Sequence, residues 1–177
     1  FTLVQTTSSG FLFLGQGSIG SIPFPVILLF SLVFFGQWVL SKTIFGRYVC
    51  AIGGNKEAAR FSGISVDYYQ IMTFVIGGGL ASLAGIIYAS RLLSVSPMAG
   101  QGYEMDAIAA TVIGGTSVSG GQGSVVNTLI GVLLLSVISN TFNLLGIPVF
   151  AQYVIKGIII LIAVGLDAYN KKTLEGR

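Results

Sequence analysis

The sequence predicts an all-α fold: a polytopic bundle of transmembrane helices, with about five membrane segments in a single domain over residues 1–177. Only 8% of the residues are charged and 53% are hydrophobic, whereas soluble domains carry about 25% charged residues. The charge is too sparse to cover a water-facing surface. The chain also has no histidine and one cysteine, Cys50, which excludes an imidazole base, an internal disulfide and a cysteine metal cluster.

Long apolar runs give the expected membrane segments. Residues 22–40, 69–90, 125–147 and 149–166 each have close to the about 20 residues that span the hydrocarbon core. Residues 107–121 are apolar but shorter and rich in glycine. We expect this segment to cross as a short helix plus a non-helical stretch, buried among the other spans because lipid does not tolerate free backbone groups.

The distribution of charge predicts the orientation. Basic residues concentrate in the polar segment 41–68 and in the C-terminal tail after residue 166. Because cytoplasmic loops carry an excess of Lys and Arg, both segments are expected in the cytoplasm. The number of crossings between them must then be even, which is why the short run 107–121 is counted as a crossing.

Two glycine-rich motifs resemble nucleotide-binding sequences but lack their context. GQGSIG at 15–20 precedes a membrane span rather than lying in a βαβ unit, so a surface turn is the favoured interpretation. GGTSVSGGQGS at 114–124 lacks the lysine that a phosphate loop requires. With six scattered carboxylates, no catalytic or metal-binding residues are predicted, and the chain is not expected to be an enzyme or to hold a cofactor.

Polar residues in the spans are the candidates for a solute path. Asn140 and Asn143 near the end of one span could bind a polar solute or bond to another helix, and the two interpretations have equal weight. Thr116 and Ser117 in the glycine stretch are further candidates. Lys156 marks a possible functional site, but its place near the start of its span favours a side chain that extends to the outer interface.

Small residues recur every fourth position in the second span. Gly77, Ala81, Gly85 and Ala89 lie on one helix face. They predict close packing of another helix, with a hinge at residues 77–79 as the less favoured alternative.

The stretch GGNKEAARFSG at 53–63 is a small charged island between glycines. Asn55 suits a helix N-cap, Glu57 suits the first turn, and Gly63 suits the position after the C-cap. Glu57 and Arg60 have the spacing of an ion pair across one turn. Ala58 and Ala59 would give this helix a slim side that could enter a groove on another protein; an ordinary solvated helix is equally consistent with the composition.

Three stretches carry a resemblance to a known family. FGRYVCAIGGNKEAARFSGIS, GYEMDAIAATVIGGTSVSGGQGS and VIKGIIILIAVGLD occur in this order. Together they resemble the permease subunit of ABC importers of the ribose and simple-sugar type, which are related to branched-chain amino acid permeases. The resemblance covers nearly the whole chain and corresponds to the C-terminal half of such permeases, so an upstream portion is expected.

The resemblance implies a function and a set of partners. Such a permease lies in the bacterial inner membrane and pairs with a second permease copy or homologue. Separate ATPase subunits bind ATP and magnesium on the cytoplasmic face, and a periplasmic binding protein delivers the solute. No nucleic acid partner is expected. The resemblance assigns coupling to the ATPase to one set of residues: Gly53, Gly54, Asn55, Lys56, Glu57, Ala58, Ala59, Arg60, Ser62 and Gly63.

Two other functions remain open at the level of sequence. A secondary transporter would place carboxylates in the middle of the membrane for ion coupling, and none was identified there. A membrane scaffold subunit would use the same helix packing without a solute path. ATP-dependent uptake distinguishes the permease from both.

Overall fold

A computed structural model describes residues 9–92, 98 and 100–175 of the chain. It is helical apart from one short antiparallel hairpin. The helices are α1 (Ser9–Gln16), α2 (Phe24–Lys42), α3 (Ile44–Gly54), α4 (Lys56–Phe61), α5 (Val66–Leu92), α6 (Tyr103–Ile113), α7 (Val125–Leu144) and α8 (Val149–Glu175). The hairpin pairs β1 (Ser18–Ile19) with β2 (Ile22–Pro23). The described part of the chain therefore has the predicted all-α architecture.

Among the described residues, three helices are long and apolar enough to cross a membrane: α2, α5 and α7. In α8 the stretch Val149–Ile162 is apolar as well. Helix α2 begins after Pro23, with Pro25 in its first turn, where a missing backbone N–H costs nothing. These four helices correspond to the four long apolar runs of the sequence, and α5 and α8 extend beyond them.

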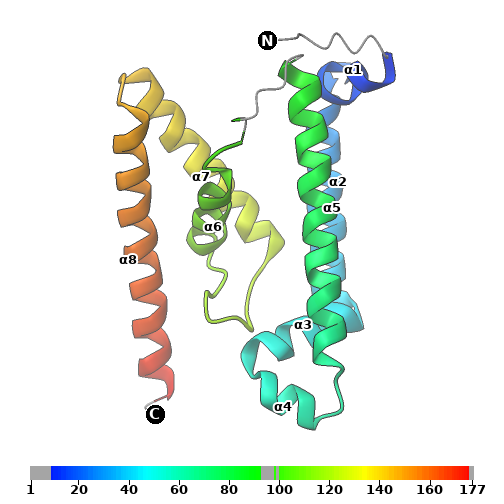
Figure 1. Cartoon of the computed structure of the whole chain (residues 1–177), viewed down its shortest axis with the longest axis vertical. Helices are drawn as coiled ribbons and strands as arrows, with labels where there is room; N and C mark the ends of the chain where they lie inside the picture. The colour runs from blue at the N-terminus through cyan, green and yellow to red at the C-terminus, as the bar shows by residue number, and fades with distance from the viewer. Residues whose placement is uncertain (1–8, 93–97, 99, 176–177) are drawn as a thin grey trace.

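The helices form two groups that run along the long axis of the molecule (Figure 1). One group holds α1 to α5, in which α1 and α3 contact both α2 and α5. The other holds α6, α7 and α8, with α6 in contact with both of its neighbours, and α7 also contacts α2. Helix α4 and the C-terminal end of α8 lie at the same end of the molecule (Figure 1), as an even number of crossings between them requires.

The segment 107–121 consists of a helix and a non-helical stretch, as predicted, while its crossing of the membrane stays a prediction. Helix α6 ends at Ile113, and the chain to Ser124 then turns through three glycines with positive φ: Gly115, Gly120 and Gly121. Ala109 and Ala110 of α6 are buried against Leu135 of α7. An added Cβ at Gly131 of α7 would lie 2.1 Å from the carbonyl oxygen of Ala110, so the two backbones touch because this position has no side chain.

The polar segment before α5 differs from the expectation. The polar segment 41–68 contains an additional helix, α3, whose N-cap is Thr43; the Thr43 side chain accepts a hydrogen bond from Gly46 N at 3.3 Å.

The segment GQGSIG at 15–20 forms the end of α1 and the first strand of the β hairpin. This agrees with a turn rather than a nucleotide site. The predicted close packing on the small-residue face of α5 is not found at its two glycines: among the described residues, a Cβ at Gly77 or Gly85 would have nothing within 4 Å.

Candidate functional site

The charged island folds as a short helix, α4, with a cap at each end. Oδ1 of Asn55 accepts a hydrogen bond from Ala58 N at 2.9 Å, which satisfies one of the free N–H groups of the first turn. At the other end Gly63 has a φ of 80°. Its N–H donates to Arg60 O at 3.1 Å, and Ile64 N–H donates to Ala59 O at 3.1 Å. These two bonds form a Schellman motif, so both predicted caps of α4 are confirmed.

The two alanines of α4 have different surroundings. Ala59 is 4% exposed and packs with Ile52 of α3 and Val66 of α5. Ala58 is exposed. The interpretation that both alanines form one outward slim side is therefore only half supported, because Ala59 attaches α4 to its own chain.

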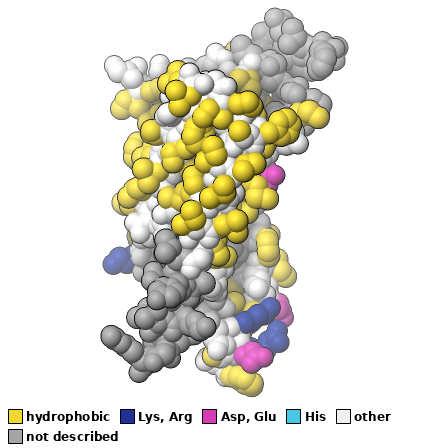
Figure 2. Space-filling model, turned by 90° about the vertical axis from the view of Figure 1, so that its left-hand side faces the viewer, with side chains coloured by type: hydrophobic (Ala, Val, Ile, Leu, Met, Phe, Trp, Pro, Cys, Tyr) yellow, Lys and Arg dark blue, Asp and Glu magenta, His cyan; other side chains and the backbone are white. Residues whose placement is uncertain are grey.

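The outward surface of α4 exposes both charged side chains and an aromatic side chain. We call the exposed residues Lys56, Glu57, Ala58, Arg60 and Phe61 the α4 surface. Phe61 is 91% exposed, although burying such a ring is favourable. Figure 2 shows acidic and basic side chains gathered at this end of the molecule, and apolar ones over most of the described face above them.

The predicted ion pair within α4 is wrong. Arg60 Nη2 lies 3.5 Å from Asp67 Oδ1, and Asp67 is in the first turn of α5. The turn at residues 62–65 brings this carboxylate beside Arg60, whereas Glu57 remains exposed. Because both partners are well exposed, the pair contributes at most a few tenths to about 1 kcal/mol.

The glycines that precede α4 touch a distant glycine pair. An added Cβ at Gly53 would lie 2.6 Å from Gly121 N, and one at Gly120 would lie 2.5 Å from Gly53 O. A Cβ at Gly121 would lie 2.9 Å from Gly54 Cα. We call this contact of Gly53 and Gly54 with Gly120 and Gly121 the glycine junction. It joins the charged island directly to the loop between α6 and α7.

The asparagines proposed for a solute path have different roles. Asn143 Oδ1 accepts a hydrogen bond at 3.0 Å from Nε2 of Gln152, a buried residue of α8. Gln152 also donates to Ile147 O at 3.0 Å. Asn143 therefore stabilises the α7–α8 turn, which is the helix-bonding alternative. Asn140 is exposed on α7.

Thr116 and Ser117 lie at the opposite end of α7 from the two asparagines. They line a cavity of about 370 Å³ beside the glycine junction, together with Cys50 of α3 and Thr128 of α7. Ser117 is buried, and its N–H donates to Gln122 O at 3.1 Å. The four predicted solute-path residues therefore do not form one site.

Lys156 does not extend to an interface. Its Nζ lies 2.7 Å from Asp106 Oδ1 of α6, and its side chain is 9% exposed. The sequence interpretation is wrong here because the carboxylate that holds Lys156 is fifty residues away in the chain. The expectation that no carboxylate lies in the middle of the membrane stays a prediction, since Asp106 is near the start of α6.

Two further polar contacts tie the helices together and were not foreseen. Ser90 of α5 is fully buried; its Oγ accepts from Gly15 N at 3.0 Å and donates to Phe11 O. Gln37 of α2 accepts from Val125 N at 2.9 Å, which caps α7. The sequence indicates such contacts only through a glutamine or serine inside an apolar run, and this pattern does not predict which residue the side chain will contact.

Comparisons with known proteins agree with the architecture. The profile of the family described as branched-chain amino acid transport system / permease component matches residues 2–164. The chain is 52% identical to the ribose import permease protein RbsC of Bacillus subtilis, over 91% of this chain and 50% of that protein.

More distant relatives are similar over the same part. The chain is 48% identical to the xylose transport system permease protein XylH of Haemophilus influenzae, over 86% of this chain and 41% of that protein. It is also 48% identical to RbsC of Escherichia coli strain K12, over 89% of this chain and 49% of that protein. The chain thus spans about half the length of these relatives. No solved structure matches.

Proposed function

Because the chain belongs to the branched-chain amino acid transport system / permease component family, we propose that it is part of the membrane-spanning permease subunit of an ABC importer for a simple sugar. The names of its relatives, which include ribose and xylose permeases, support the solute class. The apolar helices α2, α5 and α7 supply the membrane-spanning part. Nucleotide and magnesium belong to a separate ATPase subunit in this proposal.

The observation that carries the coupling role is the α4 surface. A capped helix that is anchored by one buried alanine, Ala59, presents a bare aromatic ring and three charges at one end of the molecule. Exposed aromatic side chains often become the buried anchors of protein interfaces, and rim charges fix the register. We assign this surface to contact with the ATPase, with Phe61 as the anchor and Ala58 as the point of close approach.

The remaining residues of the predicted coupling set support the helix rather than contact the partner. Asn55 and Gly63 form its caps, Ser62 is its C-cap residue, and Gly53 and Gly54 belong to the glycine junction. In this arrangement the cytoplasmic face is the end that carries α4 and the C-terminus of α8. A second permease copy, a periplasmic binding protein and a location in the bacterial inner membrane complete the proposal.

The test replaces Ala58 with tryptophan, with Ala58→Ser as the matched control. Both variants change an exposed position, so both should insert and fold. We expect the tryptophan variant to lose the copurifying ATPase subunit and ATP-dependent uptake, and the serine variant to keep both. Normal uptake by Ala58→Trp would refute the coupling role of the α4 surface.

One observation favours a second candidate, a secondary transporter. The ion pair of Lys156, whose side chain is buried, with Asp106 is of the kind that ion-coupled carriers use within the membrane. Uptake in vesicles separates the two functions. An importer driven by ATP continues when a protonophore collapses the proton gradient and stops when ATP is withheld, whereas a proton-coupled carrier does the reverse.

A further inference from the structure

We propose that the cavity between α6 and α8 binds the transported solute, and that its occupant is a neutral polyhydroxylated molecule of monosaccharide size. This inference rests on the proposed transport function and names the site and ligand class for it. The cavity has a volume of about 470 Å³, within the range of small-molecule sites. It lies in the part of the molecule away from α4, between the N-terminal end of α6 and the first turns of α8 (Figure 1).

Lys156 and Asp106 form an ion pair in surroundings where charged groups are energetically unfavourable. The Lys156 side chain is 9% exposed and that of Asp106 is 37% exposed, in a region of apolar helices. Intramembrane charges are expensive and mark solute pathways. The lysine ammonium has three N–H donors, and Asp106 accepts one of them. Because Lys156 lines the cavity, its ammonium is available to donate to a ligand oxygen.

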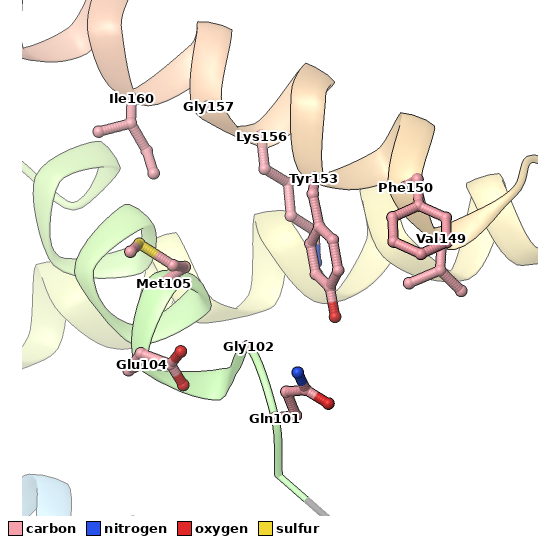
Figure 3. A pocket seen from close by; sticks show the side chains of 10 residues that line it. All are labelled: Gln101, Gly102, Glu104, Met105, Val149, Phe150, Tyr153, Lys156, Gly157 and Ile160. Carbon is pink, nitrogen blue, oxygen red and sulfur yellow. The ribbon is translucent and has the colours of Figure 1, made fainter. Parts of the chain in front are cut away.

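The other polar groups suit hydroxyls, which both donate and accept. Gln101 and Glu104 approach from the α6 side, and Tyr153 extends from α8 with its hydroxyl towards Gly102 (Figure 3). A Cβ at Gly102 would lie 2.9 Å from the Tyr153 hydroxyl oxygen, so this glycine leaves room for the tyrosine. The set supplies amide, ammonium and phenol donors beside carboxylate and amide acceptors.

The apolar lining and the charge balance narrow the ligand class. The rings of Tyr153 and Phe150 flank one side of the cavity (Figure 3) and offer flat surfaces to the C–H face of a sugar ring. The lining carries one ammonium, that of Lys156, and one carboxylate, that of Glu104. It therefore has no excess positive charge to bind the phosphate group of a sugar phosphate. A neutral sugar needs no such charge.

Gly157 provides a direct test because it lines the cavity and has open space beside it. A Cβ there would have nothing within 4 Å, and the same holds for Gly165, two turns further along α8. Gly157→Leu should narrow the cavity, and its Cβ would meet no neighbour. Gly165→Leu makes the same change to the same helix outside the cavity lining and is the matched control.

The experiment uses the complete transporter, purified from its native membrane with its partner subunits and reconstituted into vesicles, with D-ribose and D-xylose as probes. We expect Gly157→Leu to raise the sugar concentration for half-maximal uptake at least about tenfold, or to abolish uptake. Gly165→Leu should change it less than about twofold, and D-ribose 5-phosphate should not compete. Equal effects of the two variants, competition by the phosphate, or a parent protein that takes up neither sugar would each overturn the proposal.

The same uptake measurements distinguish a failure of this site assignment from a failure of the proposed importer function. If uptake by the parent protein needs ATP and persists unchanged in Gly157→Leu, the site is wrong and the importer function stands. If uptake needs no ATP but fails in Gly157→Leu alone, the importer function is wrong and the site stands. Retention of the ATPase subunit and of ATP hydrolysis by Gly157→Leu shows that the loss of uptake is not a loss of assembly.

Discussion

The glycine junction gives the most direct prediction of stability, because its geometry compares two adjacent residues. A Cβ at Gly53 would lie 2.6 Å from Gly121 N, whereas one at Gly54 would lie 3.9 Å from Gly121 Cα. The first distance is a clash with backbone and the second is an ordinary contact. Both glycines are in α3, so alanine gains about the same 0.5–1 kcal/mol of helix stability at either position.

The clash therefore decides the difference between the two variants. Overpacking costs about 1–3 kcal/mol, and the backbone atoms of Gly121 cannot rotate away as a side chain would. We expect Gly53→Ala to have a free energy of unfolding about 1–3 kcal/mol below that of Gly54→Ala. The assay is unfolding of the purified protein by titration with SDS in mixed micelles, followed by circular dichroism.

A second pair tests the partner side of the junction. Gly120 and Gly115 both have positive φ, 88° and 79°, so alanine is strained at either position. Only at Gly120 would the Cβ meet another residue, at 2.5 Å from Gly53 O. Gly120→Ala should be less stable than Gly115→Ala by a similar margin. If Gly53→Ala matches Gly54→Ala and Gly120→Ala matches Gly115→Ala, the junction is not a close contact in the folded protein and the reasoning fails.

Three other changes have expected outcomes in the same unfolding assay. Asn55→Ala removes the N-cap of α4 and should cost about 1 kcal/mol; an unchanged stability would show that α4 does not depend on its cap. Ser90→Ala leaves the Gly15 N–H without its acceptor and should cost about 1–3 kcal/mol, whereas a neutral effect would mean that α1 is not anchored there. Asp106→Asn leaves the Lys156 ammonium without its carboxylate and should cost about 3 kcal/mol, at the low end for a buried pair because the Asp106 side chain is 37% exposed. Lys156→Met leaves only the more exposed carboxylate and should cost less, about 1–3 kcal/mol, so the reverse order would contradict the burial argument.

Local features were predictable from the sequence because they depend on a few neighbouring residues. Asn55 and Gly63 define the ends of α4 through hydrogen bonds within six residues of chain. The start of α2 follows from its two prolines, and the glycines of 114–124 predicted a non-helical stretch. The long apolar runs predicted four helices, with most ends displaced by no more than about three residues; α8 continues from residue 166 to Glu175, since hydropathy does not determine where helical hydrogen bonding stops.

Features that depend on a distant partner, or on apolar residues interrupted by charged residues and glycines, could not be predicted from the sequence. Helix α3 was missed because its charged and glycine residues hid the apolar positions Phe45, Val49 and Ile52, which have helical spacing. Lys156 was misinterpreted because only the packing of α6 on α8 brings Asp106 to it. The solute-path candidates were chosen by polarity alone, and polarity does not distinguish a helix-bonding Asn143 from a cavity-lining Gln101.

The geometry joins the two proposed sites through one continuous path. Helix α4 follows Gly53 and Gly54, and these contact Gly120 and Gly121. That loop continues from α6, whose first turn lines the cavity with Glu104. Backbone contacts without side chains have no flexible atoms to absorb a displacement. A movement of α4 must therefore either move the α6–α7 loop or separate the glycine pairs. Only the first of these outcomes would carry a change at the α4 surface to the residues around the solute, so coupling between the two sites requires that the glycine junction stay in contact.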